Sequence, residues 1–127
     1  MSNILVESSN KNYLKLFTEM GDPDVDQTAR LLEVSRNQLA ETFGLSADQI
    51  RPERLSSLAK ERIGELAGTL ELVADIFKGD QKKTIFWIKT PNPHFGGMSP
   101  RSLIVRGRYN KVKQFVLAAA SREQQSA

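Results

Sequence analysis

The sequence of 127 residues contains no cysteine, which excludes disulfide bonds, thiolate zinc sites and cysteine nucleophiles. His94 is the only histidine, so the usual zinc constellations and histidine-based catalytic triads are excluded as well. The glycine-rich stretch FGGMSP follows no predicted strand and has the wrong spacing for a phosphate-binding loop. We therefore expect no enzymatic activity, no cofactor and no metal.

Long apolar runs are also missing. No uninterrupted apolar stretch approaches the roughly 20 residues of a membrane span, and the start MSNILVESSN lacks a basic segment followed by an apolar one. With 39% hydrophobic and 26% charged residues, the composition is that of an ordinary globular domain. We expect a soluble, cytoplasmic protein.

Four carboxylates have the spacing of a calcium-binding loop. Asp22, Asp24, Asp26 and Glu33 would occupy its ligand positions, but Gln27 stands where that loop requires glycine. A helical pattern also begins at Val25. These carboxylates are therefore interpreted as helix caps rather than metal ligands.

Acidic residues are scarce in the C-terminal part. Residues 1–80 contain 9 Lys and Arg against 14 Asp and Glu, whereas residues 81–127 contain 9 Lys and Arg against Glu123 alone. The two parts could present surfaces for different partners, the basic one for phosphate or an acidic protein. Alternatively, the protein is dipolar and its two parts attract each other.

The periodicity of apolar residues predicts an all-α fold without a sheet. Ser35 and Ser46 each begin a Ser-x-x-Gln capping box, and Ser99 followed by Pro100 is a further helix start. Helices are expected over residues 12–20, 25–33, from 35, from 46, 55–78, 80–89, 99–107 and 109–120. This pattern divides the chain into an N-terminal arm with a short helix (1–23), a helix-turn-helix-like region (24–54), a C-terminal helical domain (55–120) and a flexible tail (121–127).

Residues 55–78 contain apolar positions at alternating spacings of four and three. Such a seam is typical of helix packing, either within one chain or in a coiled coil. It lasts barely three heptads, so we favour an intramolecular core and keep a dimer as the alternative. The seam consists of Ala59, Ile63, Leu66, Leu70, Val73 and Phe77.

Residues 36–53 fit a helix-turn-helix, a DNA-binding unit. Ala40 supplies the small residue of the first helix, Gly44 the turn and Ile50 the apolar anchor of the second helix. Pro52 ends that second helix after little more than one turn. The alternative is a folding and dimerising core that does not touch DNA. Candidate base contacts are Ser46, Gln49 and Arg51, and candidate phosphate contacts are Arg36, Asn37 and Arg54.

The C-terminal third reads IFKGDQKKTIFWIKTPNPHFGGMSPRSLIVRGRYNKVKQFVLAA. Residues 55–120 resemble the toxin-binding domain of the Xre/MbcA/ParS antitoxins, in which a tryptophan-containing helix leads into a PNPxxGGxSP turn and a helix that ends in an RxGRY-like step. Residues 24–54 resemble the degenerate helix-turn-helix that precedes this domain in the family. The matching turn positions are Pro91, Asn92, Pro93, Gly96, Gly97, Ser99 and Pro100, followed by Leu103, Gly107 and Tyr109.

The resemblance implies a type II antitoxin. Its partner would be a RES-domain toxin that consumes NAD and is encoded beside it, and the antitoxin would be a homodimer that also represses its own operon. The alternative is a stand-alone DNA-binding regulator. The glycines, Ser99 and Pro100 have sufficient structural roles, whereas an exposed mixture of aromatic and arginine residues is typical of interfaces. The expected toxin contacts are His94, Phe95, Arg101, Arg106, Arg108 and Tyr109.

Overall fold

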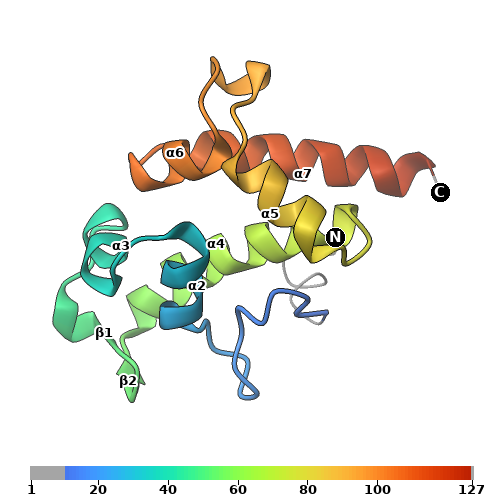
Figure 1. Cartoon of the computed structure of the whole chain (residues 1–127). Coiled ribbons are helices and arrows are strands. Elements are labelled where there is room, and N and C mark those ends of the chain that lie inside the picture. Colours follow the sequence, from blue (N-terminus) through green and yellow to red (C-terminus); the bar gives the residue numbers. More distant parts are fainter. Residues whose placement is uncertain (1–10, 127) are drawn as a thin grey trace.

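A computed structural model describes residues 11–126 and is mostly helical, which confirms the all-α prediction. Figure 1 shows the arrangement. The helices are α2 (Val25–Leu32), α3 (Arg36–Thr42), α4 (Ser57–Ile76), α5 (Gln81–Lys89), α6 (Pro100–Val105) and α7 (Tyr109–Ser126), with 3-10 turns η1 (Ala47–Gln49) and η2 (Pro93–Phe95) and strands β1 (Ile50–Arg51) and β2 (Arg54–Leu55).

The long helices α4 and α7 pack against each other, and α5 and α6 complete the C-terminal part of the molecule (Figure 1). The α4 seam forms the centre of the core, because Ala59, Ile63, Leu66 and Leu70 are fully buried. The intramolecular interpretation of the seam is confirmed. A homodimer would have to use another surface.

Helix starts were predictable from the capping residues. Ser35 and Gln38 form the capping box of α3, Asp80 accepts the N–H of Lys83 at the start of α5, and Ser99 accepts that of Ser102 at the start of α6. These bonds satisfy backbone donors that have no partner within the helix.

The predicted helix at residues 12–20 is wrong. This segment is an irregular loop in which Asn12 and Lys15 have positive φ angles and Phe17 forms an isolated bridge with Pro23. Leu14 and Leu16 are buried, and the carboxylate of Glu71 on α4 accepts both of their backbone N–H groups at 3.0–3.1 Å. A buried acceptor on a distant helix thus takes the place of helical hydrogen bonds. The predicted arm at residues 1–10 lies outside the described residues.

The helix predicted after Ser46 is also wrong. Residues 47–49 form only a 3-10 turn, and a two-strand antiparallel hairpin follows, contrary to the expected absence of a sheet. Arg51 precedes Pro52, and the residue before proline favours extended backbone. The hairpin pairs Arg51 with Arg54 and Ile50 with Leu55.

The last helix was expected to end at Ala120, with residues 121–127 as a flexible tail. Instead, α7 continues to Ser126. The polar residues of SREQQS do not end a helix, because arginine, glutamate and glutamine are good helix formers.

Candidate functional site

The turn between α5 and α6 is held by its own backbone and by Asn92. The Asn92 side chain accepts the N–H of His94 at 2.9 Å, and the Asn92 backbone bonds to Met98 and Gly97 at 3.1 Å. Gly96 and Gly97 have φ angles of 65° and 84°, which favour glycine. The predicted structural role of the two glycines is confirmed, and the turn is a fixed element.

An aromatic cluster lies beneath this turn. The Phe95 ring lies 6.3 Å from the Trp87 ring and 5.3 Å from the Phe115 ring of α7, while Trp87 stacks on Phe115 at 6.0 Å. The expected exposure of Phe95 is wrong, because the side chain is only 9% exposed. Asn92 and the glycines turn the chain back over α7, so Phe95 packs in the core. His94 is exposed and lies 5.0 Å from the Phe115 ring.

Tyr109 is the second predicted contact that is buried. Its hydroxyl group contacts the Thr69 hydroxyl at 2.8 Å and donates to the Glu65 carbonyl at 3.0 Å, both on α4. Burial raises the pKa of Tyr109 far above its ordinary value. Tyr109 begins a buried stripe that continues at Val112 and Val116, and this periodicity could have revealed its position. Its expected exposure is wrong.

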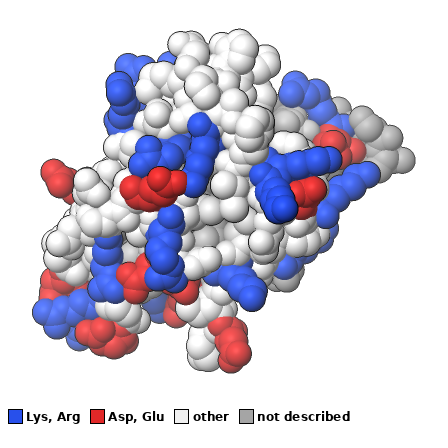
Figure 2. Space-filling view, in the orientation of Figure 1, with Lys and Arg blue, Asp and Glu red and all other residues white. Residues whose placement is uncertain are grey.

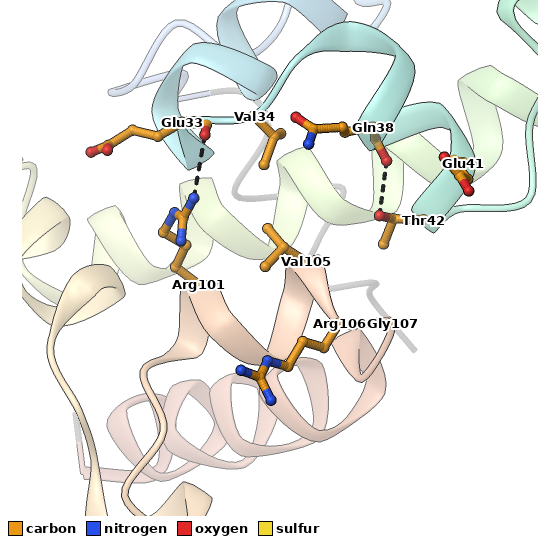
Figure 3. Close-up of a pocket in the computed structure, with 9 residues that line it drawn as sticks. All are labelled: Glu33, Val34, Gln38, Glu41, Thr42, Arg101, Val105, Arg106 and Gly107. Atoms are coloured by element: carbon orange, nitrogen blue, oxygen red, sulfur yellow. Dashed lines mark hydrogen bonds between the residues drawn. The ribbon is translucent and has the colours of Figure 1, made fainter.

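The arginines differ in their surroundings. Arg101 is half-buried and links α6 to the end of α2, donating to the carbonyls of Leu32 at 2.5 Å and Glu33 at 3.3 Å. Arg106 and Arg108 are exposed. In Figure 3, Arg101 points toward Glu33, whereas Arg106 points away from α3.

A groove of about 640 Å³ lies between α3 and α6. In Figure 3, Val34 and Val105 approach each other from the two sides, and Gln38, Glu41 and Thr42 line the α3 side. The residues that line it include no histidine, cysteine or nucleophile–base pair, and no acidic or histidine cluster suited to a metal occurs within residues 11–126. The groove therefore has no catalytic arrangement.

Charges of the two halves of the chain pair with each other at the surface. Lys89 of α5 pairs with Glu33, and Lys113 of α7 pairs with Glu65 of α4. Lys89 also lowers the pKa of Glu33 through their hydrogen bond. Figure 2 shows blue and red side chains intermingled, without one large basic patch on that face. Part of the charge asymmetry is thus used for contacts between the two halves.

The predicted DNA contacts do not share one helix. Arg36 and Asn37 lie in the first turn of α3, and Arg36 forms a two-point contact with Asp26 at 2.7 and 2.9 Å. Residues 46–54 lie on η1 and the hairpin instead. There, the Gln49 side chain accepts the Ser46 N–H at 2.9 Å, Arg51 pairs with Asp48 at 2.8 Å, and Arg54 is exposed.

Helices α2 and α3 also follow each other across a short turn, an order that the helix-turn-helix shares. Helix α2 has eight residues, Glu33 follows with φ 57° and ψ 44°, and Ser35 caps the seven residues of α3. A left-handed residue between two short helices is typical of this motif, where glycine is common. The sequence signal is the Ser35 cap one turn after the apolar helix 25–32. The predicted pairing of α3 with a helix at 46–51 missed it.

The all-α fold carries a hydrogen-bonded turn with exposed arginines nearby, and arginine is enriched at protein interfaces. Residues 72–108 match the family described as the antitoxin Xre/MbcA/ParS C-terminal toxin-binding domain. This match confirms the resemblance to the toxin-binding domain of Xre/MbcA/ParS-type antitoxins over residues 72–108, and it supports an antitoxin role with a toxin partner. No curated protein and no solved structure matches the chain. No described helix is long and apolar enough to cross a membrane.

Proposed function

We propose that this protein is the antitoxin of a type II toxin–antitoxin system and neutralises a RES-domain, NAD-consuming toxin by binding it. The observation that carries the proposal is the family match over residues 72–108, which contains α5, the turn and α6. The turn is fixed by Asn92 and by packing of Phe95. A fixed surface loses little conformational entropy on binding, which favours affinity.

The toxin contacts of this proposal are the exposed members of the predicted set. His94, Arg106 and Arg108 are exposed and lie on or next to the matched turn and helix. Phe95 and Tyr109 support this surface through their buried packing, and Arg101 supports it because its hydrogen bonds hold α6 to the end of α2. Arginine is enriched among residues that dominate interface energies.

Co-purification tests the proposal. The tagged chain is co-expressed with the product of the adjacent gene, and the complex is purified at several salt concentrations. We expect a stoichiometric complex that Arg106→Glu with Arg108→Glu weakens, whereas Arg54→Glu, an equally exposed arginine in the other half of the chain, leaves it intact. Absence of a complex with the unmodified chain would overturn the antitoxin assignment.

Operator binding is the second part of the proposal. The order of α2, the left-handed Glu33 and the capped α3 supports α3 as the helix that enters the major groove. Asn37 is an exposed side chain at its start, and asparagine can bond the edge of adenine. This assignment replaces residues 46–54 as the expected base-reading segment.

Fluorescence anisotropy with DNA from upstream of the gene tests operator binding. We expect affinity that falls with salt, and Asn37→Ala should reduce it more than Gln49→Ala does. DNA binding without any toxin complex would instead favour a stand-alone regulator. Light scattering of the free chain tests the proposed homodimer, whose interface must lie outside the buried α4 seam.

A further inference from the structure

Helix α5 presents an apolar side chain to solvent. Phe86 is 70% exposed, and among the described residues the only other large apolar side chain so exposed is Met20, at 88%. Thr84 and Ile88 are buried on the same helix, so the helical period places Phe86 on the opposite face. The core does not account for a phenylalanine at this position.

A small apolar hollow lies beside Phe86. It has a volume of about 190 Å³ and is lined by Phe77, Phe86, Trp87, Thr90 and Pro91, among others. Small-molecule sites are usually about 300–1,000 Å³, so this hollow suits an inserted side chain better than a ligand. Its lining residues lie within the segment that matches the toxin-binding family.

Lysines surround Phe86 on the surface of α5. Lys82, Lys83 and Lys89 are four and three residues before it and three residues after it, which makes them its neighbours on the helix. Lys89 pairs with Glu33. Within residues 11–126, Lys82 and Lys83 have no ion pair. The apolar centre therefore has a basic rim.

The basic rim decides between two kinds of partner. A two-fold homodimer through this face would place the same patch of each copy against the other. Lys82 and Lys83 of both copies would then lie in one interface, where Glu33 is paired with Lys89. Like charges in an interface are unfavourable. The charge favours a different protein with an acidic surface.

We propose that Phe86 and this hollow, which together we call the α5 anchor, contact an acidic surface on the toxin. Phe86 inserts among apolar side chains of that surface, and the hollow receives an apolar side chain from it. This assignment rests on the proposed antitoxin function and names the contact that dominates it. Phe86 supplies a large apolar group at low conformational cost, while Lys82 and Lys83 accelerate encounter with the acidic partner.

Calorimetric titration of the purified adjacent-gene product with four forms of the full chain tests the α5 anchor. Phe86→Ser should weaken binding about 10- to 100-fold, the range for loss of one buried large apolar side chain, and Phe86→Leu should restore most of the affinity. Met20→Ser, which removes an even more exposed apolar side chain elsewhere, should have no effect. Circular dichroism should show the same melting temperature for Phe86→Ser and the unmodified chain.

A second measurement locates the contact. Trp87 is the only tryptophan and lines the hollow, so incorporated 5-fluorotryptophan gives one fluorine resonance, which should shift when the toxin binds. Normal affinity of Phe86→Ser with an unshifted resonance would overturn the α5 anchor and leave the antitoxin function standing. A change confined to self-association would assign the anchor to a second copy and overturn the proposal. Absence of binding by the unmodified chain would overturn both.

Discussion

Glu71 is the buried carboxylate that attaches the N-terminal segment to α4. It is 0% exposed, and its two oxygens accept the backbone N–H groups of Leu14 and Leu16. Replacement by alanine would leave both donors without a partner in an apolar environment. Each buried donor without a partner costs about 1–3 kcal/mol, so Glu71→Ala should lower the free energy of unfolding by about 2–6 kcal/mol. Glu71→Gln keeps one acceptor and should cost about 1–3 kcal/mol.

The pH dependence follows from the pKa of Glu71. Burial raises this pKa above its ordinary value near 4.5, against the lowering effect of the backbone hydrogen bonds. The folded state therefore binds the proton more tightly than the unfolded state. The Glu71 contribution to stability is greatest below the unfolded pKa and decreases as the pH rises through the folded pKa. Glutamine does not titrate, so the cost of Glu71→Gln should be larger at pH 4 than at pH 7.

Urea unfolding followed by circular dichroism between pH 4 and pH 8 measures these differences. Glu61→Gln is the matched control, because Glu61 lies on the same helix and is exposed. A cost of less than about 0.5 kcal/mol for Glu71→Ala is typical of surface substitutions. Such a value would refute the conclusion that Glu71 attaches the N-terminal segment to α4. A cost of Glu71→Gln that grows from pH 4 to pH 7 would refute the direction of the pKa shift.

Three further substitutions test the packing around the turn and the central helices. Phe95→Ala should lower the free energy of unfolding by about 3–5 kcal/mol, because Phe95 belongs to the aromatic cluster; a melting temperature within about 2 °C of the unmodified chain would contradict its burial. Tyr109→Phe should cost about 0.5–1.5 kcal/mol through loss of the contact with Thr69, and an unchanged urea midpoint would show that the hydroxyl is dispensable. Gly44→Ala should cost about 1–2 kcal/mol because the φ angle is 68°, and thermal unfolding without any loss of stability would count against that strain.

Local chemistry made much of the fold predictable. Ser35, Asp80 and Ser99 fix helix starts through bonds to backbone groups only three residues away, and the α4 seam follows from spacing alone. The errors have non-local causes. The conformation of residues 12–20 depends on hydrogen bonds to the carboxylate of Glu71, which is more than 50 positions away in the sequence. No periodicity within the segment indicates that contact.

The candidate surface was less predictable, because residue type does not determine which side of the chain faces solvent. Phe95 and Tyr109 are aromatic and were expected outside, yet the turn and the α7 stripe place them inside. Phe86 is exposed although it is apolar. The helical period places it opposite Thr84 and Ile88, but the burial of the polar Thr84 is known only from the structure.

We propose that this protein prevents NAD loss by binding a RES-domain toxin. The most direct measurement is cellular NAD content and growth after induction of the adjacent gene, with and without this chain. We expect NAD to fall and growth to stop with the adjacent gene alone, and co-expression of this chain to restore both. NAD content that is unaffected by the adjacent gene, or lost equally when this chain is present, would contradict it.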